Sequence, residues 1–209
     1  MKLYRKKISE KNQEAANDSY IDYFQTDSFQ KHKDNINGII MSLPYRESPD
    51  GWGKYGCFAV GGLEYIGFSD DSCYLLVVSS SGRGVINISS GEFVARDKSL
   101  DGEWLDENHL LCQGIGPLEG KVIRTTGIGG GGLPTQTLHG DSVYLAAPSF
   151  PCYDVVYQPS YQNCLIDGQN NDCVKIYRGF VNYCGFSWDG NTMVVVDEDI
   201  NIWCRHSKG

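Results

Sequence analysis

Pairs and triples of acidic residues are the groups in this sequence best suited to chemistry. Two carboxylates facing each other at about 5–10 Å can act as the acid and base of a hydrolase. Here the acids stand in polar stretches that predict turns, where solvated side chains are the ordinary outcome. Together they would form a negative rim that attracts a basic protein partner. The acidic candidates for partner binding are Asp70, Asp71, Asp106, Glu107, Asp197, Glu198 and Asp199.

Three further patterns are similar to ligand-binding or catalytic motifs, but each lacks part of the motif. The run from Gly127 to Gly132 satisfies G-x-G-x-x-G, yet no helix N-terminus follows to meet a pyrophosphate. His139, Asp141 and Ser142 have no G-x-S-x-G elbow around the serine. The stretch 167–172, DGQNND, lacks the ligand ladder of a calcium loop. We therefore predict no catalytic residue, no cofactor and no metal.

Aromatic residues in or beside loops rich in proline and glycine form a second set of candidates. Aromatic side chains in loops are common anchors of protein interfaces. Aromatic side chains beside strands usually complete the core instead, and both interpretations stay open. The aromatic candidates for partner binding are Trp52, Tyr55, Tyr153 and Tyr157.

Charge is unevenly distributed along the 209 residues, whose formal net charge is −8. Residues 1–11 carry a net +4, so the remaining chain, with 13 basic and 25 acidic residues, carries −12. An acidic body repels phosphate backbones and anionic lipid, so we expect neither a nucleic acid nor a membrane as partner. We find no apolar segment of a secretory signal and no membrane-length apolar run, so we expect a cytoplasmic protein.

Eight cysteines would be reduced in that compartment. They form no C-x-x-C pair and match no common zinc spacing. Several stand within apolar runs, among them Cys73, Cys184 and Cys204, where a thiol behaves as a small hydrophobic group. We predict that most of the cysteines are reduced core thiols.

The elements that must position these residues are short apolar runs separated by turns. Such a pattern, rich in glycine and in aromatic and β-branched residues, predicts an all-β domain of antiparallel strands over residues 36–209. Its first strand is expected at 36–43. Residues 1–35 predict a basic and polar appendage, with a short helix over 9–24 and a polar connector over 26–35.

An internal repeat dominates this pattern. The stretch from Gly67 to Ala95 alternates apolar runs with tight turns, and a shorter copy runs from Gly185 to Cys204. In both copies Gly-Phe-Ser is followed by an aspartate two residues on and by an apolar strand that ends in Val-Val. A repeated supersecondary unit is typical of blades or stacked sheets.

These motifs resemble WD40-like β-propeller blades. Phe68-Ser69-Asp70-Asp71 and Phe186-Ser187-Trp188-Asp189-Gly190 match the opening of such a blade, and Ser89-Ser90-Gly91-Glu92 matches the turn between blades. Cys204 follows Trp203 where the family has aspartate. The resemblance implies blade-like antiparallel meanders in a partial or small β-propeller, with a β-sandwich as the alternative.

The predicted function is a non-catalytic protein-binding module with a basic partner. Small, acidic, all-β cytosolic proteins also resemble, in type, the bacterial immunity proteins that neutralise antibacterial toxins. That resemblance implies a cognate toxin domain as partner. The alternatives are a hydrolase with carboxylates at a propeller-like cleft, and a small-ligand sensor that uses the loop from Gly127 to Gly132.

Overall fold

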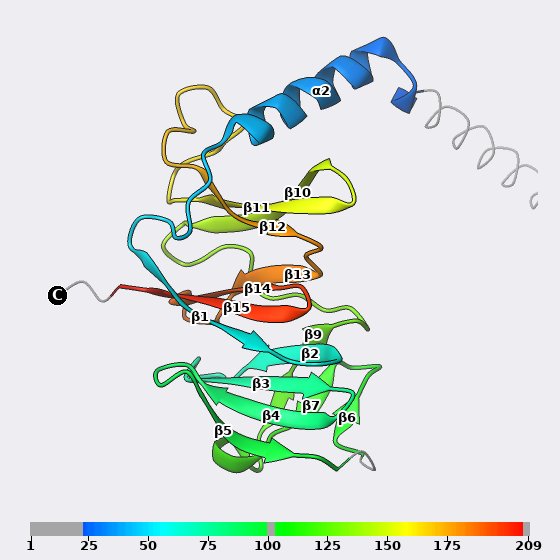
Figure 1. The fold of residues 1–209 in the computed structure, drawn as a ribbon, viewed down its shortest axis with the longest axis vertical. Coiled ribbons are helices and arrows are strands. Elements are labelled where there is room, and N and C mark those ends of the chain that lie inside the picture. The colour runs from blue at the N-terminus through cyan, green and yellow to red at the C-terminus, as the bar shows by residue number, and fades with distance from the viewer. Residues whose placement is uncertain (1–22, 100–102, 207–209) are drawn as a thin grey trace, which may run out of the picture. The chain divides into compact units, whose positions relative to one another are not determined.

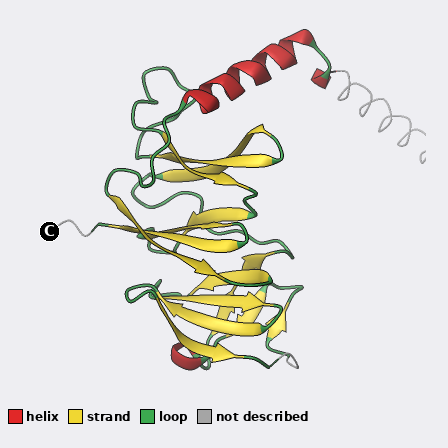
Figure 2. Ribbon diagram, viewed as in Figure 1, coloured by secondary structure: helices red, strands yellow, loops and turns green. Residues whose placement is uncertain are grey.

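The computed structural model describes residues 23–99 and 103–206. The protein is mostly β, with 45% strand and 12% helix, and its strands form four antiparallel sheets (Figure 2). The all-β prediction with an N-terminal helical segment is therefore confirmed. All the strands belong to a compact unit that begins at Leu43, whereas helix α2 (Asp27–Ser42) belongs to a separate one.

Helix α2 corrects the prediction for the start of the chain. The polar connector expected at 26–35 and the strand expected at 36–43 are both wrong, because one helix covers most of the two. The helix predicted at 9–24 lies almost entirely outside the described residues. The boundary between appendage and β unit accordingly falls after residue 42, not after residue 35.

The error at 36–43 has a simple physical cause. Ile36, Ile39, Ile40 and Leu43 are spaced at i, i+3, i+4 and i+7, which is one face of a helix, although the run is short and β-branched enough to suggest a strand. The helix also has an N-terminal cap, since the Thr26 hydroxyl accepts a hydrogen bond from the Phe29 N–H at 3.2 Å.

The four sheets are defined by their hydrogen-bonded strand order. Sheet A is β10 (Ser142–Ser149), β11 (Cys152–Gln158) and β12 (Val174–Gly179). Sheet B is β1 (Trp52–Ala59), β15 (Asp199–Arg205), β14 (Thr192–Val196) and β13 (Tyr183–Phe186). Sheet C is β5 (Glu92–Asp97), β4 (Gly82–Asn87), β3 (Tyr74–Ser79), β2 (Leu63–Phe68) and β9 (Thr126–Gly127). Sheet D is β6 (Leu105–Asp106), β7 (Leu111–Gln113) and β8 (Val122–Arg124), with a short 3-10 turn η1 (Gly116–Leu118) before β8.

Three hydrophobic cores lie between successive sheets. Side chains of sheets A and B share the first core, those of B and C the second, and those of C and D the third. Figure 1 shows sheets A, B and C one above another. Over the described ranges the sheets close into neither a barrel nor a propeller. The arrangement is therefore an open series of packed sheets.

Several connections of the β unit lie on the same side, which we call the turn edge. It includes the links β10–β11, β12–β13, β14–β15, β1–β2 and β3–β4, on the right in Figure 1. In sheet B, Ala59 pairs with Asp199, which places the β1–β2 link beside the β14–β15 turn. In sheet C, Leu63 pairs with Ser79, which places the same link beside the β3–β4 turn. Three of these links are hairpin turns, and the links β12–β13 and β1–β2 connect neighbouring sheets.

The internal repeat builds the same turn twice. In the first copy the Ser69 hydroxyl donates to Asp71 Oδ1 at 2.6 Å and accepts from the Tyr74 N–H at 3.0 Å. In the second copy Ser187 donates to Asp189 at 2.6 Å and accepts from the Thr192 N–H at 3.0 Å. The shared Ser-x-Asp spacing thus encodes a β-turn closed by side chains.

The glycine that opens each copy has a matching role in packing. A Cβ on Gly67 would lie 2.4 Å from the backbone oxygen of Arg124, and a Cβ on Gly185 would lie 2.5 Å from the Leu133 Cβ. Each glycine therefore lets another stretch of the chain approach the strand closely. The repeat specifies both the turn and this approach.

Candidate partner-binding surface

Two of the predicted aromatic contacts are buried, so the prediction is wrong for them. Trp52 and Tyr157 each expose 2% of their surface in the core between sheets A and B. The Trp52 indole N–H donates to the Tyr157 hydroxyl at 2.9 Å. Trp52 opens β1, and pairing of β1 with β15 carries it inside. A loop rich in proline and glycine before Trp52 could not reveal that pairing.

Tyr55 is exposed but already engaged. Its hydroxyl donates to the Ser89 carbonyl at 2.7 Å, and its ring lies against Gly91. The side chain therefore ties β1 to the β4–β5 turn. Its contacts are within the β unit, although part of the ring faces solvent.

The seven acidic candidates do not gather in one place. Asp70 and Asp71 lie in the β2–β3 turn, and Asp106 and Glu107 lie at the β6–β7 turn. The other three lie at the β14–β15 turn of sheet B. Hydrogen bonds from the Ser69 hydroxyl and the Cys73 N–H lower the pKa of Asp71, which identifies this carboxylate as part of its turn.

Asp106 pairs with a histidine on the surface. His109 Nδ1 lies 2.7 Å from Asp106 Oδ2, and this hydrogen bond, with a second from the His109 N–H, lowers the pKa of Asp106. The His109 side chain is 74% exposed. An acid and a histidine do meet here, but on an open turn. Glu107 is exposed beside them.

At the β14–β15 turn, predicted acids meet a phenol and a thiol. The Tyr177 hydroxyl donates to Asp197 Oδ2, and the Asp199 N–H donates to Asp197 Oδ1 at 2.9 Å. The Cys57 thiol lies 3.6 Å from Asp199 Oδ2. Burial raises the pKa of the Tyr177 phenol, and the hydrogen bond to Asp197 adds to the rise. The phenol therefore stays a donor, and Asp197 is held in place.

Exposed aromatic side chains lie near the β14–β15 turn on the turn edge. Phe150, in the β10–β11 turn, is 76% exposed, and Phe180, after β12, is 68% exposed. The half-buried Tyr153 links them, because its ring centre lies 6.5 Å from that of Phe150 and its backbone pairs with Gly179. A Cβ on Gly179 would lie 3.8 Å from Asp197 Oδ2, so the aromatic and acidic groups adjoin.

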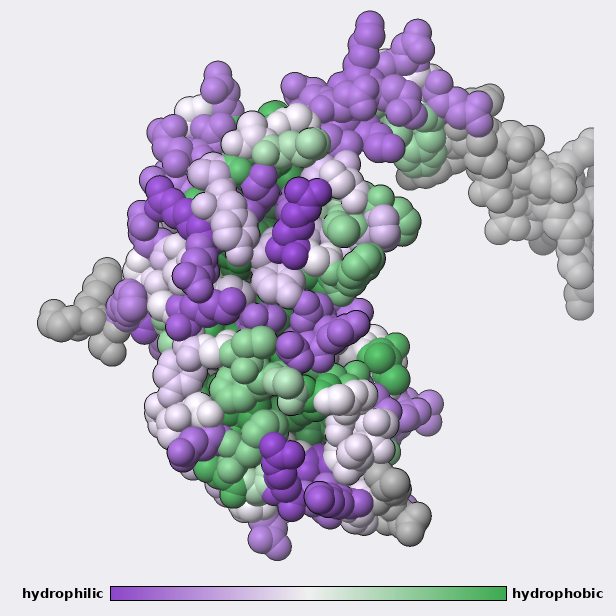
Figure 3. Space-filling view, in the orientation of Figure 1, coloured by the Kyte–Doolittle hydropathy of each residue, from purple (hydrophilic) through white to green (hydrophobic). Residues whose placement is uncertain are grey.

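We call this set the docking surface. It brings together four predicted residues and two that the sequence reasoning missed. Phe150 and Phe180 had a signal, since each is a large apolar residue at a turn, where polar residues are usual. Figure 3 shows hydrophobic side chains along this edge of the molecule. The docking surface consists of Phe150, Tyr153, Phe180, Asp197, Glu198 and Asp199.

The glycine-dense run forms a tight hairpin. Gly127 and Gly130 exchange two backbone hydrogen bonds of 2.9 Å each. A Cβ on Gly127 would lie 1.9 Å from the Glu64 carbonyl oxygen, so glycine there permits the pairing of β9 with β2. Packing therefore explains the glycine at position 127.

Asp141, which the sequence places near His139 and Ser142, pairs with an arginine instead. Asp141 is buried and forms an ion pair with Arg205, and it also accepts the Ser160 N–H at 3.0 Å. His139 is exposed and donates its backbone N–H to Thr137. Across the described ranges, no group of three or more histidine, cysteine, aspartate or glutamate residues is arranged to hold a metal.

All eight cysteines are free thiols, and four of them are buried. Burial raises the pKa of Cys112 to about 11 and that of Cys184 to about 12, so neither is a reactive thiolate near neutral pH. Cys73 and Cys57 are exposed. Cys73 is therefore not a core thiol, in contrast to the prediction.

Alkylation of the native protein is expected to label Cys73 before Cys57. Partial burial and the nearby Asp199 carboxylate raise the pKa of Cys57, so less of its thiol is ionised at pH 8. Labelling of Cys57 should still be accelerating at pH 9, and Asp199→Asn should speed it several-fold at pH 8. Peptide mass spectrometry after timed iodoacetamide treatment measures both rates. Equal rates in the variant and the parent would contradict the role of Asp199.

Comparison with known proteins adds no family to this description. No protein-family model matches the chain, and no curated protein matches it either. None of the helices described here is long and apolar enough to cross a membrane. The functional argument therefore depends on the geometry of the chain itself.

Proposed function

We propose that this protein is a non-catalytic binding module that holds a basic protein partner on its docking surface. The observation that supports this proposal most directly is the meeting of exposed phenylalanines with an acidic turn. Monomeric proteins seldom expose neighbouring large apolar side chains without a use for them. The proposed partner class is an antibacterial toxin domain, which an immunity protein neutralises by covering its active site.

The surface has the parts that protein interfaces use. Phe150 and Phe180 can enter pockets of a partner as anchors, and such residues carry most of the binding energy. Glu198 and its neighbours can attract a basic partner and accelerate association. Short links between paired strands fix the backbone of these residues, which lowers the ordering cost on binding.

Removal of the two anchors is expected to weaken partner binding most. Phe150→Ala with Phe180→Ala should raise the dissociation constant by at least about 30-fold, the effect of one hot-spot residue. The probe is the purified product of a toxin-like gene adjacent to the gene for this protein, titrated by isothermal calorimetry. Survival of cells that express that toxin is the second readout.

Tyr161→Ala is the matched control, because Tyr161 is 94% exposed in a loop after β11, outside the docking surface. Binding by the control should equal that of the parent chain. A second variant, Glu198→Lys, should slow association and reduce its dependence on salt. Full protection by the double phenylalanine variant would exclude this surface as the binding site.

The two alternatives have less support in the geometry. A hydrolase needs carboxylates that converge, whereas the predicted acids occupy turns of three different sheets. The Asp106–His109 pair stands on an exposed turn. A sensor built on the run from Gly127 to Gly132 would need space that the hairpin there fills with its own backbone.

A further inference from the structure

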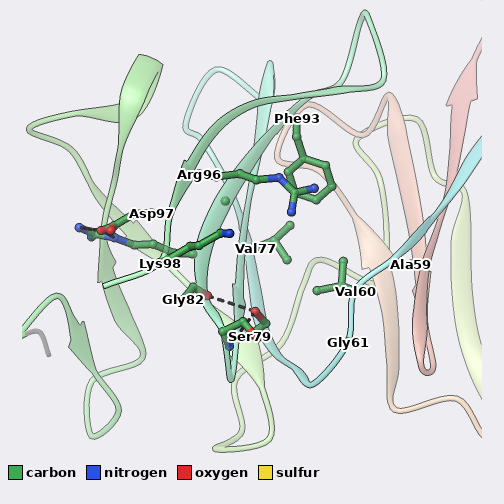
Figure 4. Close-up of a pocket in the computed structure, with 13 residues that line it drawn as sticks. Ala59, Val60, Gly61, Val77, Ser79, Gly82, Phe93, Arg96, Asp97 and Lys98 are labelled. Atoms are coloured by element: carbon green, nitrogen blue, oxygen red, sulfur yellow. Dashed lines mark hydrogen bonds and ion pairs between the residues drawn. The ribbon is translucent and has the colours of Figure 1, made fainter. Parts of the chain in front are cut away.

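A hollow of about 240 Å³ opens at the outer end of the core between sheets B and C. It is bordered by the β1–β2 link and by strands β3, β4 and β5 (Figure 4). Figure 3 shows hydrophobic side chains gathered over this part of the unit. The hollow is separate from the docking surface, since none of the six docking residues lines it.

The floor of the hollow is apolar. Val77 is almost fully buried, and Val60 and Phe93 pack partly buried against the same core. Figure 4 shows Val60 and Val77 facing the space below the Phe93 ring. A guest that fills the space must therefore present apolar surface on this side.

Cations stand at the rim, although the protein is acidic. Figure 4 shows Arg96 and Lys98 reaching toward the hollow, with the Arg96 guanidinium beside the Phe93 ring, 4.0 Å from its centre. Among the described residues, neither cation takes part in an ion pair. Two cations with no carboxylate partner next to an apolar space are suited to an anionic guest.

The third cation at the hollow is already engaged. Arg83 donates two hydrogen bonds to Asp97 Oδ2, at 3.1 and 3.0 Å, and a third to the Gln113 carbonyl at 2.6 Å. Its guanidinium also lies 5.0 Å from the centre of the Trp104 ring. Arg83 and Asp97 thus brace the strands, and the charge available to a guest comes from Arg96 and Lys98.

We propose that this hollow binds a small organic acid, a carboxylate attached to an aromatic or short aliphatic body. The carboxylate lies between Arg96 and Lys98, where a guanidinium offers paired donors to its two oxygens. The body covers Val60, Val77 and Phe93. The volume is below the range of about 300–1,000 Å³ for drug-sized ligands, so the guest is about the size of one ring.

Free phosphate is a poorer fit for the same cations. A phosphate group needs donors on all sides, whereas the floor of this hollow offers carbon atoms and would leave its oxygens unpaired. An organic-acid site should therefore bind a ligand with an apolar body more tightly than free phosphate, whereas a phosphate-binding site should not.

Titration of the full-length protein with phenylacetate, followed by amide NMR shifts, tests the proposal. Shifts should concentrate on β3 to β5 and the β1–β2 link. Phenylacetamide, which has the same shape without the charge, should bind at least about tenfold more weakly. Inorganic phosphate at the same concentration should leave these signals unchanged.

Arg96→Gln and Lys98→Gln should each raise the dissociation constant for phenylacetate by about tenfold. Both side chains are exposed, so the variants should unfold like the parent chain. Arg124→Gln, which removes one positive charge outside the hollow, is the matched control and should bind normally. Docking-surface variants should bind phenylacetate normally as well. The tests of partner binding and of organic-acid binding are therefore independent.

Four results would each overturn the proposal, of which three concern relative affinities. These three are equal binding of phenylacetate and phenylacetamide, tighter binding of phosphate than of phenylacetate, and unchanged binding by the Arg96→Gln and Lys98→Gln variants together. Absence of shifts on β3 to β5 with phenylacetate, benzoate and hexanoate would do so too.

Discussion

Asp141→Asn is expected to lower the free energy of unfolding by about 3 kcal/mol, the lower end of the cost of breaking a buried ion pair. The substitution preserves shape but leaves the Arg205 guanidinium without its anion. The Arg205 side chain is 24% exposed, and its guanidinium lies 4.4 Å from the centre of the Trp52 ring. Its Nε has no hydrogen-bond partner, so Asp141 is its main compensation.

Urea unfolding followed by circular dichroism measures this loss. The control is Asp50→Asn, because Asp50 pairs with Arg46 at 2.9 Å on the surface, with 84% of its own side chain exposed. Exposed pairs contribute little, so the control should stay within about 0.5 kcal/mol of the parent. A loss below about 1 kcal/mol for Asp141→Asn would show that water replaces the carboxylate at Arg205.

Gly67→Ala and Gly185→Ala are the second pair of substitutions with a large expected effect. The new methyl groups would lie 2.4 Å from the Arg124 oxygen and 2.5 Å from the Leu133 Cβ, well inside van der Waals contact. Overpacking of this kind in an interior costs about 1–3 kcal/mol. We expect Gly67→Ala to stand at the upper end. Its obstacle is the Arg124 backbone oxygen at 2.4 Å, which moves only with strand β8.

Gly132→Ala is the matched control, since a Cβ there meets no atom within 4 Å. It should be neutral or stabilise the protein by up to about 1 kcal/mol. Thermal unfolding of the three variants in parallel separates local overlap from the general effect of glycine replacement. If the Gly67→Ala variant is as stable as the control, strand β8 can shift at little cost in free energy.

Local patterns predicted most of the strands because their information lies within a few residues. The central meander and the copy from Gly185 carry their turns as Ser-x-Asp and glycine, and each becomes a hairpin in the structure. The short apolar run Cys164-Leu165-Ile166 is similar to a strand pattern, but it lies in a series of turns.

Long-range pairing could not be predicted from the sequence. Trp52 pairs with Arg205, and the first strand therefore becomes the outer strand of the last meander. For the same reason the burial of Trp52 and Tyr157 was missed, because it depends on sheets A and B packing together.

The candidate site could also be predicted only in part. The acids of the β14–β15 turn were visible as a charged run, whereas their proximity to Phe150 and Phe180 depends on the order of the sheets. The cations of the hollow were hidden by the net negative charge of the chain. Charge totals describe the whole surface, while a binding site depends on a few neighbouring groups.

The pairing of β1 with β15 has a consequence for how the protein can be divided. Sheet B is completed by a strand encoded about 140 residues before its partner, so a cut in the β1–β2 link at residues 60–62 separates two pieces that must find each other again. A synthetic peptide carrying β1 should add itself to the open edge of β15 in a chain that lacks it. The fold therefore offers a natural split point for a complementation reporter.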